Sequence, residues 1–210
     1  MNLIQAIRSR RAVRDYLSQP VSAGLIYQLI EAAAWAPSAM NAQDWTFSIV
    51  TDREVLDEIA GEAKAWMLAN TGELPREGHF REMLKDPQFH ILYRAPVLVV
   101  ISAPKGTWAR ENCALAAQNL MLMATSLGLG SCWIGFAQGW LNSPQGRQAL
   151  SLPDSFEAVA PIILGHPRGV TPLVMRKKPD MHWIGHHFEH VERDQPTLQE
   201  PGLFGPLIHP

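Results

Sequence analysis

Apolar and polar residues follow two different periods along this chain, and these periods predict where helices and strands lie. Apolar positions that recur every three to four residues indicate helices, whereas alternating or short continuous apolar runs indicate strands. Helices are predicted at residues 3–7, 23–35, from about 52 onward, 108–127 and 144–150. Strands are predicted at residues 45–50, 96–102, 131–136 and 158–165. Helices and strands interspersed in this way indicate helices packed against a sheet, and they leave the strand directions open.

Residues at the ends of these segments support the predicted boundaries. Ser22 is a favourable N-cap for the second helix, and Thr51 with Glu54 has the pattern of a capping box for the third. The second helix should end before Pro37, and the long helix should end at Gly128. Because apolar residues surround the long helix on most sides, we expect it to be buried on nearly every side.

The size of the chain allows one substantial core. Its 210 residues are 47% hydrophobic, which suits a single domain and is short for two. We predict one domain over residues 1–193, with a polar, turn-rich and lid-like excursion at about 64–92. Residues 194–210 are predicted to be a C-terminal extension, because the chain from Gly169 onward is rich in proline and histidine and shows little periodicity.

Charge and cysteine content exclude several classes of protein. The 18 basic and 20 acidic residues give a net charge of −2, which argues against a nucleic-acid binder. No apolar run approaches the roughly 18–20 residues of a membrane span, and the first residues lack the apolar block of a secretory signal. Cys113 and Cys132 are the only cysteines and form no CxxC motif. A reduced, cytoplasmic protein is therefore expected.

A polar segment separates the second helix from the first predicted strand. The sequence APSAMNAQDW (36–45) places Ser38, Asn41 and Gln43 at close intervals. A helix exit needs only a proline or a glycine, so the additional polar side chains require another explanation. Loops held between two rigid elements are common positions for binding groups, and this loop is a candidate binding site.

Four arginines lie within seven residues near the end of the first helix: Arg8, Arg10, Arg11 and Arg14. One interpretation is a solvated basic face that complements the C-terminus of a helix. The other is an anion clamp, in which guanidinium groups grip a phosphate through paired hydrogen bonds. The lack of net basicity favours the clamp, but the residues alone leave both interpretations open.

The glycine-rich segment GLGSCWIG (128–135) differs from a dinucleotide-binding fingerprint. That fingerprint requires a strand, then glycines, then a helix, whereas the predicted order here is helix, glycines, strand. Gly135 follows the strand, where a glycine would let a planar ligand approach the backbone closely. The histidines at 182, 186, 187 and 190 and the two cysteines show no complete metal-ligand set or nucleophile pattern. The chemistry that remains is that of a bound cofactor, which supplies its own reactivity.

Four segments, in this order, resemble the FMN-dependent nitroreductases over about residues 4–178. They are SRRAVRDY (9–16), APSAMNAQDW (36–45), NCALAAQNLMLMATSLGLGSCWIG (112–135) and PIILGHP (161–167) followed by Arg176. The resemblance implies an α+β fold, a three-layer α/β/α sandwich with a mixed, mainly antiparallel central sheet. It also implies an interlocked homodimer with two FMN sites, each built from both subunits.

The resemblance implies a role for each matching residue. The implied FMN-binding residues are Arg10, Arg11, Ala12, Arg14, Pro37, Ser38, Ala39, Asn41, Gln43, Trp133, Ile134, Gly135, Arg176 and Lys178. The arginines and Lys178 would hold the phosphate and ribityl region, and the polar loop would reach the flavin of the partner subunit. The segment 133–135 would line one face and the N5 edge of the isoalloxazine, with the Gly135 N–H near N5. The resemblance implies no metal, and it names no catalytic residue.

Three positions depart from the family pattern. Ala12 stands where a serine or histidine is common, and it offers no side-chain hydrogen bond. Asp44 replaces the proline of a Gln-Pro-Trp sequence, which should loosen that turn and adds a negative charge. Gly135 occupies a position that is acidic in better-known members, so only a backbone contact carries over. These departures bear on substrate preference more than on flavin binding.

The implied reaction is a ping-pong transfer, in which NAD(P)H reduces the flavin and a small acceptor then takes the electrons in the same slot. Acceptors in the family include nitroaromatics, quinones and free flavins. Large side chains of the excursion would either roof the pocket or simply pack beneath it: Trp66, Met67, His79, Phe80, Phe89 and Tyr93. Two alternatives remain open, namely an FMN-dependent relative that dehalogenates or breaks down flavin, and a flavin-binding protein without turnover.

Overall fold

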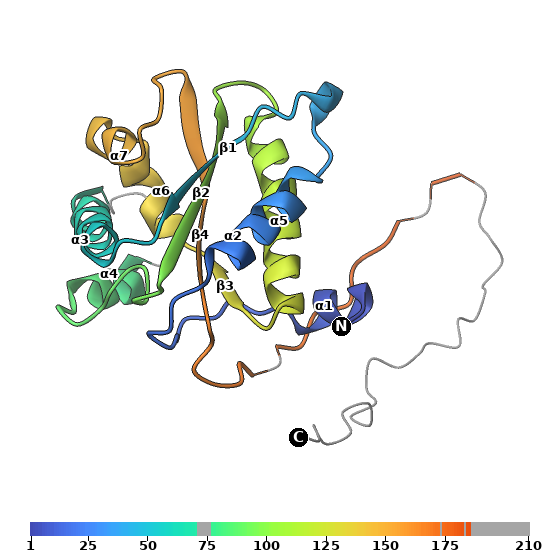
Figure 1. The fold of residues 1–210 in the computed structure, drawn as a ribbon, viewed down its shortest axis with the longest axis horizontal. Helices are drawn as coiled ribbons and strands as arrows, with labels where there is room; N and C mark the ends of the chain where they lie inside the picture. The colour runs from blue at the N-terminus through green and yellow to red at the C-terminus, as the bar shows by residue number, and fades with distance from the viewer. Residues whose placement is uncertain (71–76, 173, 183, 186–210) are drawn as a thin grey trace. The chain divides into compact units, whose positions relative to one another are not determined.

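A computed structural model of the chain describes residues 1–70, 77–172, 174–182 and 184–185, without the side chains of residues 77–80. Contacts divide the chain into two units, Met1–Leu173 and Val174–Pro210. The helices and strands named below all belong to the first unit (Figure 1). Within the described ranges, no helix combines the length and the apolar character needed to cross a membrane.

Four strands of the first unit form one sheet. They are β1 (Thr46–Val50), β2 (Val97–Pro104), β3 (Gly130–Trp133) and β4 (Phe156–Gly165), in the spatial order β1-β2-β4-β3. Each neighbouring pair is antiparallel. A parallel bridge joins Ala12 to Ser131 beside the sheet. The prediction of a mainly antiparallel central sheet is confirmed.

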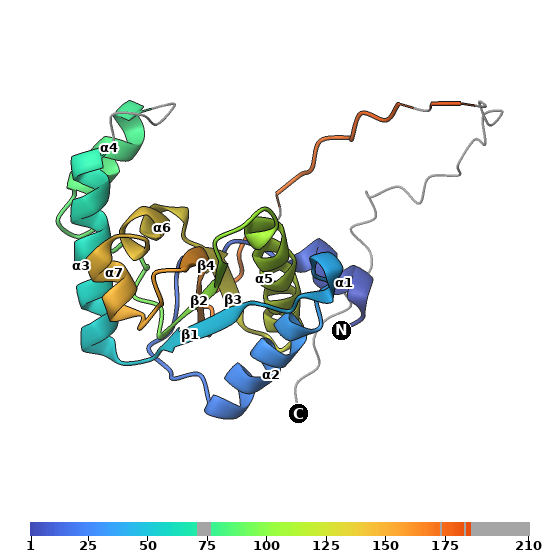
Figure 2. The same ribbon diagram turned by 90° about the horizontal axis from the view of Figure 1, so that it is seen from above.

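Side chains of β2 alternate between two cores, because successive residues of a strand point to opposite faces. Val99 and Ile101 pack with α2 (Ala23–Ala34) and α5 (Ala109–Ser126) on one face. Leu98 and Val100 pack with α3 (Arg53–Asn70) and α6 (Gly135–Leu141) on the other face. Full burial stabilises the fold by about 1.5–3 kcal/mol per side chain of this size. Figure 2 shows the sheet between these helical layers, which confirms the three-layer sandwich.

Shorter helices complete the first unit: α1 (Leu3–Ser9), η1 (Ala39–Asn41), α4 (Glu77–Lys85) and α7 (Pro144–Ala149). Ser22 caps α2 as predicted, with its Oγ accepting the N–H of Leu25. The predicted cap of α3 is wrong, because Asp52 and not Thr51 provides it. Asp52 Oδ1 accepts the N–H of Glu54 at 2.9 Å and a second amide at 3.1 Å. The carboxylate of Asp52 is a stronger hydrogen-bond acceptor than the hydroxyl of Thr51, and it also complements the positive end of the helix dipole.

Two predicted segments differ from the structure. The strand predicted at 131–136 ends at Trp133, and α6 begins at Gly135. Two glycines lower the intrinsic helix propensity of α6, so packing against α3 and β4 decides its conformation. In the predicted excursion, residues 64–70 continue α3 and residues 77–85 form α4. This region also contributes to the core, because Leu84 is fully buried.

The long helix α5 is buried on one side and exposed on the other, contrary to the prediction of burial on nearly every side. Cys113, Ala116 and Leu120 are fully buried. Leu115 is 44% exposed in the single chain, and Gln118, one turn further along, is also exposed. The exposed side of α5 therefore carries both apolar and polar side chains.

Candidate functional site

A hollow of about 430 Å³ opens beside β3 and the start of α6. Its lining residues are Arg14, Met83, Ile91, Tyr93, Cys132, Trp133, Ile134, Gly135 and Phe136. The lining is mostly apolar and aromatic and includes one cation, Arg14. Pockets of roughly 300–1,000 Å³ with such a lining and a few polar groups commonly hold small molecules.

Backbone contacts hold the segment that carries Arg14 against β3 and the end of β4. The N–H of Val13 donates to the carbonyl of Ser131 at 3.0 Å, and the N–H of Leu17 donates to the carbonyl of His166 at 2.8 Å. Gly130 permits this approach, because a Cβ at that position would lie 2.8 Å from the Cβ of Val13. The arginine-rich segment is thus placed beside a strand that is distant in sequence.

Arg14 lies over the ring of Tyr93, with its guanidinium carbon 5.8 Å from the ring centroid. A cation within about 6 Å of an aromatic face is attracted by the ring. Burial raises the pKa of Tyr93 above its ordinary value, and the charge of Arg14 opposes this rise. The phenol therefore keeps its proton at neutral pH. Tyr93 contributes an aromatic ring and a hydroxyl group to the wall of the hollow.

Arg10 and Arg11 lie at the C-terminal end of α1, where Arg10 is the C-cap. Nη1 of Arg11 donates to the carbonyls of Arg8 and Arg10, at 2.6 and 2.8 Å. Carbonyl groups at a helix end lack intrahelical partners, so Arg11 stabilises the end of α1. Its Nε is buried and has no hydrogen-bond partner among the described residues. The helix-end interpretation therefore accounts for Nη1 and leaves Nε unexplained.

The polar loop after α2 has a strained backbone. Met40, Asn41 and Gln43 have φ values of 54°, 55° and 49°, a conformation that costs a non-glycine residue about 1–2 kcal/mol. The N–H of Gln43 donates to Ser38 Oγ at 3.0 Å, and its Nε2 donates to Asn41 Oδ1 at 2.9 Å. Residues 37–43 are absent from the lining of the hollow in the same chain.

Asn112 of α5 ties both ends of this loop to the helical layer. Its Oδ1 accepts the N–H of Ala39 at 2.9 Å, and its Nδ2 donates to Asp44 Oδ1 at 3.4 Å. Asn112 is only 3% exposed. The proline common at position 44 would make the loop rigid, whereas Asp44 attaches the loop to Asn112 by a hydrogen bond. Sequence reasoning missed Asn112, although an asparagine among the apolar residues of a buried helix requires partners.

Three residues that the resemblance assigns to the flavin, Trp133, Ile134 and Gly135, all line the hollow. A Cβ at Gly135 would meet no atom within 4 Å, so the backbone there is open. α6 begins at Gly135, and the first amides of a helix lack intrahelical acceptors. Gly135 thus brings to the lining of the hollow a backbone N–H that lacks an intrahelical acceptor.

The structure assembles only part of the predicted site within one unit. The hollow brings Arg14 together with segment 133–135, and the loop at 37–43 forms a separate group. Arg176 and Lys178 belong to the second unit and are exposed, so their predicted role at the phosphate stays a prediction. Sequence reasoning did not single out Met83, Ile91 and Phe136, because each is an ordinary apolar residue until packing places it at the hollow.

Both cysteines are free and buried. Burial raises the pKa of Cys113 to about 12 and also raises the pKa of Cys132. A thiol with a raised pKa is a poor nucleophile, which agrees with a packing role for both. Within the ranges that the structure describes, no three histidine, cysteine or acidic side chains gather as a metal site. The histidines at 186, 187 and 190 lie outside those ranges.

Comparison with known proteins adds independent information. The sequence model of the nitroreductase family matches residues 7–166. A provisionally named NADH dehydrogenase/NAD(P)H nitroreductase from Methanothermobacter thermautotrophicus is 30% identical over 127 residues, which are 58% of this chain and 54% of that protein. The match thus spans about half the length of this curated relative.

Solved structures share the fold over most of the chain. A nitroreductase from Bacteroides fragilis with bound FMN is 29% identical, with a TM-score of 0.74, and the match covers 90% of this chain and all of that one. An iodotyrosine deiodinase bound to FMN and 3-iodo-L-tyrosine shares the fold at 22% identity, with a TM-score of 0.71 and coverage of 88% of this chain and all of that one. From the matched residues and the shared antiparallel sandwich, we conclude that the chain belongs to the nitroreductase family.

Proposed function

We propose that this chain is an FMN-dependent oxidoreductase that passes hydride from NAD(P)H to a small acceptor such as a nitroaromatic, a quinone or a flavin. Membership of the nitroreductase family makes it an oxidoreductase. The observation that carries the proposal is the hollow where Arg14 meets the segment 133–135. The resemblance to the FMN-dependent nitroreductases implies a flavin-binding role for both.

The residues at the hollow suit a flavin phosphate ester. Arg14 offers a charged donor and Gly135 a backbone amide. Arg11 lies outside the lining, and its buried Nε is a donor without a hydrogen-bond partner among the described residues. The apolar and aromatic lining suits a planar ring. Bound FMN would supply the electron-transfer chemistry that the side chains themselves lack.

The part of the chain in the reaction is binding, orientation and exclusion of water. We assign the phosphate and ribityl chain to Arg10, Arg11 and Arg14, with further charge from Arg176 and Lys178 in the second unit. Doubly ionised phosphate favours several guanidinium donors, because each adds a charge-assisted hydrogen bond. The free, buried cysteines fit a reducing compartment, and we place the activity in the cytoplasm.

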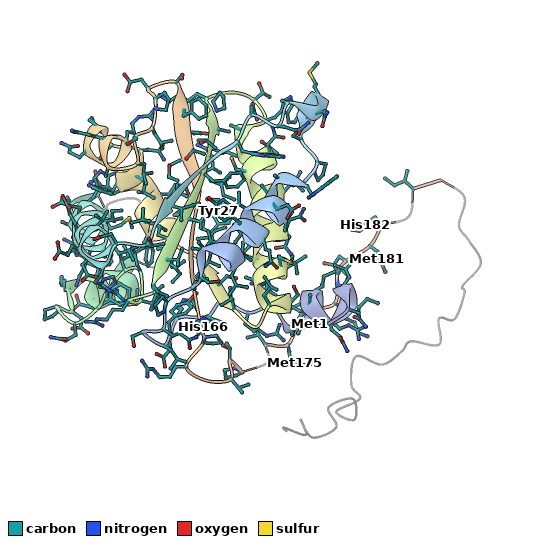
Figure 3. The ribbon with its side chains drawn as sticks, viewed as in Figure 1. Met1, Tyr27, His166, Met175, Met181 and His182 are labelled. Carbon is teal, nitrogen blue, oxygen red and sulfur yellow. The ribbon has the colours of Figure 1, made fainter. Side chains whose placement is uncertain are left out.

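The proposal requires a second copy of the chain. Large apolar side chains are exposed on the first unit of the single chain: Leu3, Ile4, Ile7, Tyr27, Trp35, Met40 and Leu115. Tyr27 on α2, labelled in Figure 3, is 75% exposed. Groups of exposed apolar residues mark interaction surfaces. We therefore propose a homodimer in which Ser38, Asn41 and Gln43 reach the flavin of the partner subunit, which would explain why this loop lies outside the hollow of its own chain.

The deciding experiment is an absorption spectrum of the purified full-length protein with FMN, before and after anaerobic addition of NADH or NADPH. We expect a yellow protein whose flavin absorbance is bleached by a nicotinamide coenzyme and returns when a nitroaromatic or quinone is added. Protein that stays colourless in excess FMN would overturn the cofactor assignment. A yellow protein that neither coenzyme bleaches would favour a flavin-binding protein without turnover, and iodide release from an iodinated phenol would favour the dehalogenating alternative.

Variants test the assignment of individual residues. Arg14→Ala should weaken FMN binding by about 1–3 kcal/mol, the scale of a lost charged hydrogen bond. Replacement of Ser38 and Asn41 by alanine together should strip the flavin and leave the dimer intact. Full flavin occupancy in either variant would contradict the corresponding assignment.

A further inference from the structure

Tyr93 stands at the wall of the hollow in an unusual backbone conformation. Tyr93 and Arg94 are successive non-glycine residues with φ values of 51° and 52°. This left-handed region is unfavourable for residues with a Cβ, and it persists only where the surroundings over-determine it. Such conformations concentrate at functional sites. We therefore expect this turn to have a functional role as well as a structural one.

Side chains of α3 hold the turn from one side. His90 Nε2 lies 3.0 Å from Asp57 Oδ1, and the N–H of Arg94 donates to His90 Nδ1 at 3.3 Å. Arg53 Nη2 donates to the carbonyl of Arg94 at 3.1 Å. The N–H of Tyr93 donates to the carbonyl of His90 at 2.8 Å. Each peptide group around the two left-handed residues is thus attached to α3 directly or through His90.

A second anchor on α3 holds the residues that precede the turn. Lys64 Nζ donates to the carbonyls of Asp86 and Phe89, at 2.5 and 2.9 Å. Phe89 meets the edge of Tyr93 with ring centroids 5.6 Å apart and an interplanar angle of 83°. Arg14 covers the Tyr93 ring at 5.8 Å. The ring is therefore fixed by Phe89 and Arg14, and its backbone is fixed by α3.

We propose that Tyr93 is a specificity-determining residue of the acceptor pocket, where its clamped ring forms the wall against which a planar aromatic acceptor packs. This inference rests on the proposed function, because it concerns the acceptor half of that reaction. Segment 133–135 is assigned to the flavin. The rest of the lining supports a planar aromatic acceptor, since Tyr93 and Phe136 supply two aromatic rings and Met83 and Ile91 supply apolar surface. Offset or edge-on contacts between aromatic rings favour such an acceptor over a compact inorganic one.

His90 acts in this scheme as a positioning residue with a defined protonation state. Its Nδ1 accepts the N–H of Arg94, so its Nε2 carries the proton and donates to Asp57. A doubly protonated ring would place a donor at Nδ1 against the N–H of Arg94 and release that bond. Asp57 and Arg53 of α3 and Arg94 of the turn are the charged groups that face the ring, and burial lowers the pKa of His90 despite Asp57. Acidification should therefore loosen the turn and weaken the binding of aromatic acceptors.

The test uses the full-length, FMN-loaded protein with nitrobenzene as a neutral aromatic probe and ferricyanide as a compact one. Nitrobenzene binding to the oxidised protein is followed by flavin absorbance and tryptophan fluorescence, so it needs no turnover. Re-oxidation of the dithionite-reduced flavin by each acceptor gives a selectivity ratio. Tyr93→Gly removes the ring and relieves the left-handed strain, so the variant should fold. Tyr93→Phe keeps the ring and is the matched comparison.

We expect Tyr93→Gly to raise the nitrobenzene Kd about tenfold and to lower the selectivity ratio by a similar factor, and Tyr93→Phe to change both by about twofold or less. An unchanged Kd and ratio in Tyr93→Gly would overturn the inference, as would an equal loss with both variants. The proposed function fails separately, if NAD(P)H does not bleach the wild-type flavin.

A second measurement isolates the positioning role of His90. Asn at position 90 keeps an acceptor close to that of Nδ1 but does not titrate, so His90→Asn should flatten the pH dependence of the nitrobenzene Kd. His182→Asn is the matched control, because His182 is exposed and does not line the hollow. A pH profile that His90→Asn leaves unchanged, or that His182→Asn flattens equally, would overturn the role of His90.

Discussion

Asn112 offers a sharp test of how the fold prepares the loop at 38–44. Replacement by leucine keeps the size of the side chain and removes both hydrogen bonds, to Ala39 and to Asp44. The loss should cost about 1–3 kcal/mol, because a buried amide loses its acceptor. The lower part of that range applies if water replaces some of the contact, since Ala39 and Asp44 are only half-buried.

The functional consequence should exceed a simple loss of stability. The strained residues of the loop depend on this attachment, and without it the conformation that reaches the flavin becomes a minor one. Affinity falls in proportion to the population of the competent state, so we expect the FMN Kd to rise roughly tenfold. FMN binding is measured by fluorescence titration, and the free energy of unfolding by urea denaturation at a fixed protein concentration, because dimer stability depends on concentration.

Asn119 provides the matched control on the same helix. Its Nδ2 donates to the carbonyl of Ala32 in α2 at 3.1 Å, without contact to the loop. Asn119→Leu should lower stability by a comparable amount, about 1–2 kcal/mol, and leave the FMN Kd near that of the wild type. An unchanged FMN Kd in Asn112→Leu, or the same loss in both variants, would refute the positioning of the loop by Asn112.

Three further predictions concern the fold itself. The pKa of His90 is lowered in the folded state, chiefly by burial. Its contribution to the free energy of unfolding is therefore present above about pH 6.5 and is lost as the pH falls through the folded-state pKa. Urea denaturation across this pH range should show the loss, and His90→Asn should abolish this pH dependence. Gly139→Ala should destabilise the protein by about 1–3 kcal/mol, since its Cβ would lie 2.1 Å from the ring of Trp66; an unchanged Tm would contradict this close packing of α3 and α6. Asn142→Leu should cost about 2–3 kcal/mol in urea denaturation, because Asn142 bonds both the N–H and the carbonyl of buried Ala158; a cost near zero would show that water replaces both bonds.

The fold followed from sequence where the deciding signals are local. The apolar run at 96–102 predicted a strand buried on both faces, and β2 has that burial. Ser22 predicted the start of α2, because capping depends on residues three positions away. α6 escaped prediction, since its two glycines disfavour a helix and the packing of Gly139 on Trp66 lies outside any local window.

The candidate site followed from sequence only for residues with unusual chemistry. Arg14 and Gly135 stood out because a charge cluster and a glycine after a strand are visible in the linear pattern. Tyr93 was named only among large residues of the excursion, and its left-handed turn depends on contacts with α3 that no spacing predicts. Whether Tyr93 only packs or also selects a ligand depends on its position in the fold, and the residue type alone does not reveal that position.

By itself, the sequence determined the alternation of helices and strands, the balance of charge, and the residue types available to hold an anion and a planar ring. Hydrophobic periodicity and helix capping depend on residues a few positions apart, so these features can be predicted without knowledge of the rest of the chain. Only the tertiary structure decided that Arg14, Tyr93 and segment 133–135 surround one hollow. That proximity arises because Gly130 lets Val13 approach β3 and α3 holds a strained turn, and long-range packing of this kind has no counterpart in local pattern.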